Sequence, residues 1–580
     1  MKKLLSVLII AVLLFGVLSP ALPVSAQDPT EEPVTSDPTE ETPPTEEATP
    51  EATPTEETPP TVEATPEATT TEETPPTVDA TPTEEATPTV EPTVEPTVPI
   101  TSTVEITPTV ELTSTLEAAA DLSAQGTFQS TTVFAAQNPN KSSATSMQIQ
   151  IFNTSGTVVY NDSVTVQPGY AYVLDQASQT LTGFTQGSAI LSAGEDMGVT
   201  TLIKTTATGV TRRFDTYNGL SGTDLGTTLT FPQVVKNLIS LGQRYNTTLA
   251  IQNTGGNTAN VTVNFKVGSS TVASPNYSIP PNASVFVNSE DVAALGSTFN
   301  GYAVVTQSAS PQPLAGMSYL RTGETTNAGS LVTLKGFALS LSSADGEVDA
   351  GTVYKYISSL GCSYSSGQSI INVGAGAASI TVRYKPAPGY GTPITYNQPI
   401  ATGSSVGIDQ RYDPNLASRP TFFGSVSFQV TSGNVVAINN LRGSGCDPTL
   451  NVSSVPVEKV AGTKLLVPMV MKNDTSGLFG SGFTWASALT INTESGSSTG
   501  IRVTYFPYSG GSPISYLASI PGGSSFSIDQ RYDTNLTSST FRGAMMIEST
   551  NGVTKISATT NLRGTGAAAD AVASYRALAR

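Results

Sequence analysis

Four acidic residues in two nearly identical stretches are the first candidates for chemistry. Asp409 and Asp413 lie in a stretch that reads Ile-Asp-Gln-Arg-Tyr-Asp, and this stretch returns 120 residues later with Asp529 and Asp533. Carboxylate oxygens are the ligands that Ca²⁺ prefers, so each pair could bind this ion if the chain folds back on itself. Paired carboxylates also catalyse glycoside hydrolysis.

The same acids fit a structural role. Asp readily closes a turn where a strand ends, and Arg411 and Arg531 can pair with a neighbouring carboxylate. Two fainter copies upstream keep only Asp175 or Asn288 at the corresponding place, so a turn role is common to all four copies. Repetition of the acids also argues against a single active site. We expect a structural role, with Ca²⁺ binding and glycan contact as alternatives.

The chain contains no histidine, which removes the usual base of Ser-His-Asp and Cys-His catalysis and the commonest zinc ligand. We therefore predict no catalytic residue, no metal site and no cofactor, and we predict that the protein is not an enzyme. A glycoside hydrolase is a remote alternative.

Tyrosines of the second half offer a binding surface instead. If they lay on an exposed sheet face, they could stack on sugar rings; the alternative is that they fill a sheet edge with the hydroxyl reaching water. The candidates occur as two matching pairs: Tyr390 and Tyr396, then Tyr508 and Tyr516.

Short runs of alternating apolar residues must position these side chains. Ile380, Val382 and Tyr384 share one parity, and period two places them on one face of a strand whose other face is polar. Turn-forming residues follow four apolar residues, and an apolar residue lies eight positions further on in each case, at Leu174, Val287, Ile408 and Ile528. The repeat is therefore 113 to 121 residues long, which is the size of a domain.

About seven strands fit in each repeat, with turn signals between them, and this favours two-sheet sandwiches. The sequence predicts an all-β protein with four β-sandwich domains at 119–224, 225–342, 343–450 and 451–566. The first domain lacks an opening Pro-x-Val strand and could be capped differently. The Ala-rich tail at 567–580 could form a short helix.

The second and fourth repeats share two motifs: Pro-x-Val-x-Lys-Asn at the start, and Phe-x-Gly before a final strand pair. The second repeat also has Thr-x-Leu-x-Ile-Gln-Asn between them. This pattern resembles the tandem immunoglobulin-like repeats of secreted surface proteins of environmental bacteria, which often follow a Thr/Pro-rich linker. The resemblance covers roughly residues 125–566 and implies an architecture but no activity. The third repeat departs from it, with Tyr354-Lys355-Tyr356 where Lys-Asn is expected.

The N-terminal segment predicts export. Residues 1–26 have a basic start, an apolar core and a small-x-small site for cleavage between Ala26 and Gln27, although an uncleaved membrane anchor is an alternative. Residues 27–118 are rich in Pro, Thr and Glu, which predicts a disordered, extended stalk. This stalk holds about 23 of the 46 acidic residues, so the remainder is nearly neutral and lacks the charge for nucleic-acid binding.

Export makes the two cysteines informative. Cys362 and Cys446 both fall in the third repeat, and oxidising surroundings favour a disulfide between them; two separate buried thiols are the alternative.

The sequence thus predicts a secreted or cell-surface bacterial protein that is non-enzymatic and acts in adhesion, spacing or envelope structure. Its expected partners are cell-envelope polysaccharide or other surface proteins, with no nucleic acid and no membrane span in the mature chain. A carbohydrate-binding protein using the tyrosines named above is the second hypothesis.

Overall fold

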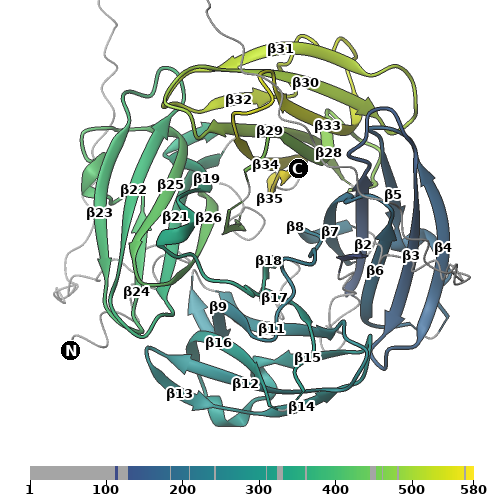
Figure 1. The fold of residues 1–580 in the computed structure, drawn as a ribbon, viewed down its shortest axis with the longest axis vertical. Helices are drawn as coiled ribbons and strands as arrows, with labels where there is room; N and C mark the ends of the chain where they lie inside the picture. Colours follow the sequence, from purple (N-terminus) through teal and green to yellow (C-terminus); the bar gives the residue numbers. More distant parts are fainter. Residues whose placement is uncertain are drawn as a thin grey trace, which may run out of the picture. The chain divides into compact units, whose positions relative to one another are not determined.

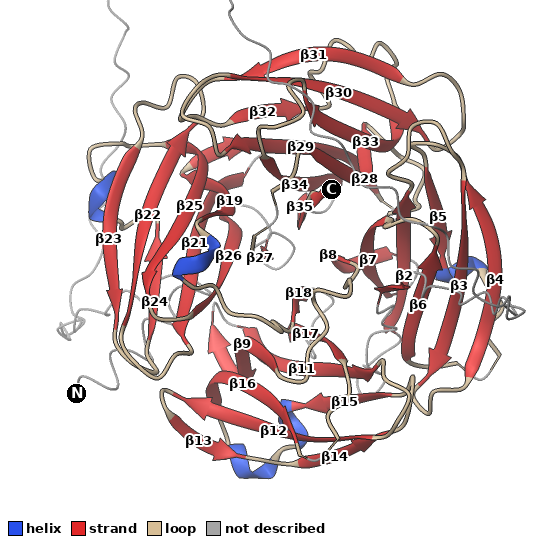
Figure 2. Cartoon of the chain, in the orientation of Figure 1, coloured by secondary structure: helices blue, strands red, loops and turns tan. Residues whose placement is uncertain are grey.

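The computed structural model describes residues 111–114, 128–182, 184–207, 210–240, 243–308, 310–322, 331–359, 362–444, 452–459, 461–479, 482–566 and 570–580. The expected signal segment with Ala26 and Gln27, and nearly all of the expected stalk, lie outside these residues. Within them the regular elements are β-strands and short 3₁₀ turns (Figure 2). All strand pairs are antiparallel and form eight sheets, which confirms the predicted all-β, tandem-sandwich class.

The third sandwich shows the common plan. One sheet has the order β19-β25-β22-β23, and the other has β20-β21-β26-β27 with β24 also paired to β21. Its strands are β19 (Glu347–Lys355), β20 (Ile357–Ser359), β21 (Cys362–Asn372), β22 (Ala378–Pro386), β23 (Ile394–Ile400), β24 (Ser405–Asp409), β25 (Phe422–Ser432), β26 (Val435–Ser444) and β27 (Val452–Val457).

The fourth sandwich repeats this plan, with sheets ordered β31-β30-β33-β28-β36 and β32-β29-β34-β35. Its strands are β28 (Lys464–Lys472), β29 (Phe483–Thr493), β30 (Thr499–Pro507), β31 (Ile514–Ile520), β32 (Phe526–Asp529), β33 (Phe541–Ser549), β34 (Ile556–Gly566), β35 (Asp570–Arg576) and β36 (Leu578–Ala579).

The first sandwich pairs the sheets β1-β6-β3-β4 and β5-β2-β7-β8. Its strands are β1 (Glu111–Ser114), β2 (Phe128–Gln137), β3 (Thr145–Asn153), β4 (Val158–Val166), β5 (Ala171–Asp175), β6 (Gly187–Ala193), β7 (Gly198–Ala207) and β8 (Val210–Asn218).

In the second sandwich, β10-β11-β17-β18 with β15 on β11 faces β13-β12-β16-β9 with β14 on β12. Its strands are β9 (Leu229–Lys236), β10 (Leu238–Ser240), β11 (Gln243–Asn253), β12 (Ala259–Val267), β13 (Ser270–Ala273), β14 (Asn276–Ile279), β15 (Ser284–Asn288), β16 (Phe299–Gln307), β17 (Leu314–Thr322) and β18 (Leu331–Lys335).

The predicted alternation builds the cores. In β22, Ile380, Val382 and Tyr384 are buried while the residues between them are only half-buried. The core cluster of the third sandwich takes side chains from both of its sheets, including Ile370 of β21 and Val426 of β25. Period two places one face of each strand against the partner sheet.

The immunoglobulin order of strands is not confirmed. In constant-type immunoglobulin domains the seventh strand lies beside the sixth. In the third sandwich β26 instead pairs with β21, and the opening strand β19 takes the place beside β25.

The structure differs from the sequence predictions at three places. The first sandwich has an opening strand without the Pro-x-Val pattern: β1 pairs with β6 and lies inside the segment predicted as stalk. β27 extends the third sandwich to Val457 by pairing with β26, beyond the predicted end at residue 450. The tail predicted to be helical forms β35 and β36, because pairing with β34 and β28 outweighs the local helix preference of alanine.

One strand from near the end of each sandwich, β8, β18, β27 and β35, contacts its neighbours in a closed cycle, and we call these four the central strands (Figure 1, with β27 labelled in Figure 2). The seams between sandwiches include apolar contacts. Tyr245 of the second sandwich packs with Val436 of the third. Phe214 of the first meets the ring of Trp485 of the fourth edge-on, with centroids 4.8 Å apart. The four sandwiches are therefore joined through their central strands.

Candidate functional site

The two copies of the predicted acidic stretch, residues 408–413 and 528–533, form the same turn, which we call the turn motif. Asp409 ends β24, and its carboxylate accepts hydrogen bonds from the backbone N–H of Arg411 at 3.0 Å and from the guanidinium of the same residue at 2.5 Å. Asp529 and Arg531 repeat this pairing at 3.1 and 2.5 Å. Each of these acids closes its own turn, as expected for a carboxylate at a strand end.

The second acid of each motif accepts hydrogen bonds from two tyrosines, one buried and one half-buried. One oxygen of Asp533 accepts the hydroxyls of Tyr505 at 2.7 Å and Tyr516 at 2.9 Å, and the other accepts the backbone and side-chain N–H groups of Asn535. Burial alone would raise the pKa of Asp533, but these hydrogen bonds outweigh burial and lower it below its usual value.

Asp413 has matching partners in the third sandwich. Its carboxylate accepts the hydroxyls of Tyr384 at 2.6 Å and Tyr396 at 2.9 Å, together with both N–H groups of Asn415. A carboxylate has about four acceptor positions, and here all of them are used. This geometry gives no support for Ca²⁺ at these acids, and the described residues contain no cluster of metal-binding side chains.

The candidate tyrosines pack internally. Tyr396 and Tyr516 are half-buried and donate to Asp413 and Asp533, and burial followed by those carboxylates raises the pKa of both phenols. Tyr508 donates its hydroxyl to the carbonyl of Pro468, and Tyr390 lies edge-on to the Phe423 ring at 5.7 Å. The exposed aromatic residues of the motif are others: Tyr412 and Tyr532, at 58% and 75% exposure.

The predicted disulfide involves one residue outside the described part of the chain. Cys362 is buried at the start of β21, and no cysteine in the described residues is free. The β21–β26 ladder ends at Ser363, next to Cys362, where Ser444 is the residue opposite. Because Cys446 itself is not described, the pairing stays a prediction.

A polar cluster that the sequence did not predict lies between the central strands. Each central strand contributes one buried residue, and we call Asp215, Thr333, Ser453 and Ser574 the central polar cluster. Asp215 accepts the Thr333 backbone N–H at 2.6 Å and hydroxyl at 3.0 Å, and it accepts the Ser453 hydroxyl at 2.7 Å. The Ser453 hydroxyl oxygen in turn accepts the Ser574 N–H at 2.8 Å. The cluster thus joins all four sandwiches.

Burial raises the pKa of Asp215 to about 7, against a usual value of 3.8, although the hydrogen bonds from Thr333 and Ser453 oppose the increase. The four residues of the cluster follow each other at 118, 120 and 121 residues, which is the repeat length. This spacing was the available signal, but the residue types differ and do not form a recognisable motif.

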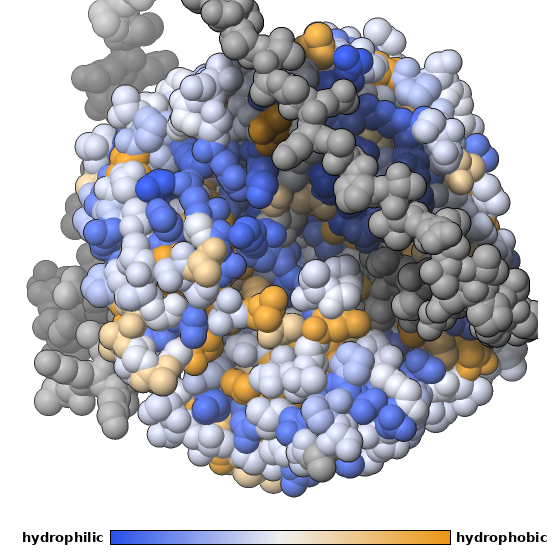
Figure 3. Space-filling view, viewed as in Figure 1, coloured by the Kyte–Doolittle hydropathy of each residue, from blue (hydrophilic) through white to orange (hydrophobic). Residues whose placement is uncertain are grey.

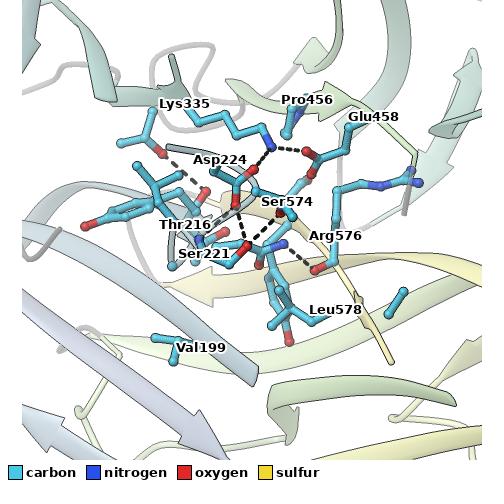
Figure 4. Close-up of a pocket in the computed structure, with 18 of the residues that line it drawn as sticks. Val199, Thr216, Ser221, Asp224, Lys335, Pro456, Glu458, Ser574, Arg576 and Leu578 are labelled. Carbon is cyan, nitrogen blue, oxygen red and sulfur yellow. Dashed lines mark hydrogen bonds and ion pairs between the residues drawn. The ribbon is translucent and has the colours of Figure 1, made fainter. Parts of the chain in front are cut away.

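A pocket of about 180 Å³ opens beside the cluster and is lined by charged residues (Figure 4). Lys335 of the second sandwich pairs with Asp224 at 2.6 Å and with Glu458, which follows the last strand of the third. Burial would lower the pKa of Lys335, but the two carboxylates outweigh it and raise the pKa. Lys335 and the two carboxylates therefore neutralise one another, and their ion pairs connect neighbouring sandwiches.

A second buried ion pair joins the third and fourth sandwiches. Arg576, 1% exposed on β35, lies 2.9 Å from the carboxylate of Asp349 on β19. The Asp349 carboxylate also accepts the side chains of Ser557 at 3.0 Å and Asn492 at 3.1 Å. These charged groups thus stabilise the contacts between sandwiches.

No protein-family model matches this chain, and no curated protein sequence matches it. Among solved structures, the tetra-tandem repeat in the extending region of a large adhesion protein is similar at 11% identity over 76% of this chain and 92% of that chain, with a TM-score of 0.09. A likeness at this TM-score carries no argument about function. No helix in the described residues is long and apolar enough to cross a membrane.

Proposed function

We propose that this chain is a non-enzymatic surface protein whose four sandwiches act together as one binding head. The observation that carries the proposal is the cycle of central strands, because it joins the sandwiches into one body through the central polar cluster. Separate domains on a string would add length, whereas a joined set adds a wide, stable surface.

The absence of an enzymatic role is supported by what the candidate acids do. Asp413 and Asp533 are saturated by tyrosine and asparagine donors, and Asp409 and Asp529 are paired with arginine. General acid–base work requires a carboxyl group that can exchange a proton with a substrate, and all four groups are engaged elsewhere.

The mixed polar and apolar surface of the protein favours polar partners. On the face shown in Figure 3, hydrophobic residues are scattered among polar ones. Two of the exposed large apolar side chains, Ile239 and Leu339, lie in the second sandwich, and two others, Leu517 and Val553, lie in the fourth. We therefore expect the partners to be polar, such as envelope polysaccharide or other surface proteins, and the location to be the cell surface or the medium.

Protease treatment of intact cells that make the full chain tests this function. We expect the sandwiches to be accessible outside the cell, and cells lacking the chain to lose adhesion or envelope integrity. Protection from protease until lysis would contradict the proposal. Hydrolysis of any member of a polysaccharide and ester panel by the purified full chain would contradict its non-enzymatic part.

A further inference from the structure

Each sandwich has a strand at the edge of a sheet that occupies the same place in its repeat. These four strands are β4, β14, β23 and β31, and each ends eight positions before the apolar residue that marks its repeat. An edge strand presents backbone N–H and C=O groups with which another chain can pair. Proteins usually protect such edges with charge, proline or short strand length.

The first three edges are protected, each in a different way. β4 has the exposed Asp162 at its centre, and two such strands paired antiparallel would place like charges opposite each other. Pro275 lies between β13 and β14, so this edge of the second sandwich consists of two strands of four residues each. β23 contains Pro399, whose missing N–H removes a donor from the free edge.

The fourth edge, β31, has none of these features. Its seven residues, Ile-Ser-Tyr-Leu-Ala-Ser-Ile, include no charge and no proline, and its central Leu517 is 67% exposed. In the third sandwich, Asn397 and Pro399 occupy the places of Leu517 and Ser519, 120 residues earlier. Among the described strands β31 is paired with β30 alone, on the side of its sandwich remote from the central strands (Figure 1). The fourth sandwich thus has an unprotected edge.

The hydrogen-bond register shows which backbone groups of β31 point outward. In an antiparallel sheet, successive residues of a strand bond alternately to the neighbour on one side and on the other. The carbonyl of Gly500 in β30 accepts the N–H of Thr550, next to β33, at 2.9 Å, so the residues on either side of Gly500 bond toward β31. Their partners in β31 are Ala518 and Ile520. The outward groups therefore belong to the alternate residues of β31: Ser515, Leu517 and Ser519.

The sequence of β31 reads nearly the same in both directions, which makes the strand complementary to itself. Antiparallel pairing with β31 of a second copy, centred on Leu517, places similar residues opposite each other. The opposed pairs are Ile514 with Ile520, Ser515 with Ser519, Tyr516 with Ala518, and Leu517 with its own copy. Apolar cross-strand pairs stabilise a sheet, and the three outward residues of each copy would exchange about six backbone hydrogen bonds.

The charges near β31 do not oppose this pairing. The cross-strand neighbour of Leu517 on β30 is Arg502, and the next residue across the sheet, on β33, is Glu548. In the paired arrangement the two copies of Arg502 would be separated by three strand spacings, or about 14 Å. This separation exceeds the screening length of about 8 Å at physiological salt.

We propose that two copies of this chain dimerise through antiparallel β31–β31 pairing, which joins their five-stranded sheets into one continuous sheet. The contact is isologous, because both copies use the same edge, so association stops at two copies. The dimer goes beyond the surface function proposed above and does not depend on it. Dimerisation is measured in the purified protein, so its failure would leave the surface location untouched.

Sedimentation of the purified full chain over a range of concentrations tests the proposal, and we expect a reversible monomer–dimer equilibrium. Leu517→Lys places two ammonium groups opposite each other and should weaken dimerisation about tenfold or more. Ser519→Pro transfers the protection of β23 to β31 and should have a similar effect. Asn397→Lys, at the matching exposed place on β23, is the control and should leave dimerisation unchanged.

Cysteine cross-linking tests the register. Hydrogen-bonded residues opposite each other in an antiparallel pair have Cα atoms about 5.5 Å apart, which suits a disulfide. Under mild oxidation Leu517→Cys should therefore cross-link two copies. Ser515→Cys is the control on the same face of the strand and should not, because the two copies of this residue would lie about 15 Å apart. The natural chain, with Cys362 and Cys446, gives the background.

Three results would overturn the proposal. The first is a monomer at every concentration up to about 1 mM, where even weak interfaces associate. The second is a dimer that survives both Leu517→Lys and Ser519→Pro in proteins that thermal unfolding shows to be folded. The third is equal cross-linking of the Leu517→Cys and Ser515→Cys variants, which would exclude pairing centred on Leu517.

Discussion

The turn motif and the central polar cluster differ in where the hydrogen-bond donors to their buried acids come from. The motif is repeated almost letter for letter, and Asp413 and Asp533 find all their donors within one sandwich. In the central cluster one acid, Asp215, serves four strands that carry Thr and Ser at the other three positions. A local task can be repeated in each copy, whereas a shared centre has room for only one acid.

The electrostatic consequence is also opposite. Hydrogen bonds lower the pKa of Asp533, so its contribution to stability is present at neutral pH and is lost as the pH falls through its folded pKa. Burial dominates at Asp215 and raises its pKa, so its contribution is present at low pH and is lost as the pH rises. The following changes would sharpen or break this contrast.

The largest effect is expected from Arg576→Ala at the seam of the third and fourth sandwiches. Removing one partner of a buried ion pair should lower the free energy of unfolding by about 3–5 kcal/mol, because Asp349 is left uncompensated. Urea unfolding followed by the fluorescence of Trp485, the only tryptophan, measures this loss. A loss below about 1 kcal/mol would show that the pair does not hold the seam.

Asp215→Asn tests the central cluster through pH. In the natural chain the folded pKa of about 7 lies above the usual 3.8, so stability from this group falls between these two pH values, because the acid ionises in the unfolded chain while it stays protonated in the folded one. The fall should reach about 4 kcal/mol, and Asn should remove it because it stays neutral. The measurement is the difference in urea midpoint between the two proteins from pH 4 to 8. Parallel pH profiles would contradict the assignment.

Asp533→Ala tests the turn motif. It leaves the hydroxyls of buried Tyr505 and half-buried Tyr516 without their acceptor, and we expect a loss of about 2–3 kcal/mol. Asp413→Ala is the matched variant in the third sandwich and should behave alike. Thermal unfolding of both variants measures the effect. A large difference between the two would show that the copies are not equivalent.

Arg531→Ala should have the smallest effect. Its ion pair with Asp529 is local to the turn, and the Asp529 carboxylate still accepts the backbone N–H of residue 531. We expect a loss of about 1 kcal/mol or less, and weaker salt dependence than in the natural chain. Thermal midpoints at low and high salt provide the comparison. An effect as large as that of Asp533→Ala would contradict the view that Asp529 and Arg531 only close the turn while Asp533 anchors the tyrosines.

Much of the fold followed from local pattern. Alternation in segments such as Ile380 to Tyr384 identified the strands, and the spacing of Leu174, Val287, Ile408 and Ile528 identified the repeat. The errors fell where tertiary pairing decides: β1 and β35 are strands because they lie beside β6 and β34, although their sequences favour no strand.

The candidate site shows the same limit. The sequence located Asp409, Asp413 and their copies and favoured a turn role, which the hydrogen bonds support. It could not show that Tyr396 and Tyr516 point inward, because alternation does not reveal which hydroxyl meets which carboxylate.

The sequence by itself determined the strands, the repeat length and the turn at each strand end, because these depend on neighbours close along the chain. Only the tertiary structure decided that Asp215, Thr333, Ser453 and Ser574 meet. The residues in contact are more than a hundred positions apart in the sequence. They meet because the four central strands pack together and exclude water from the one shared acid.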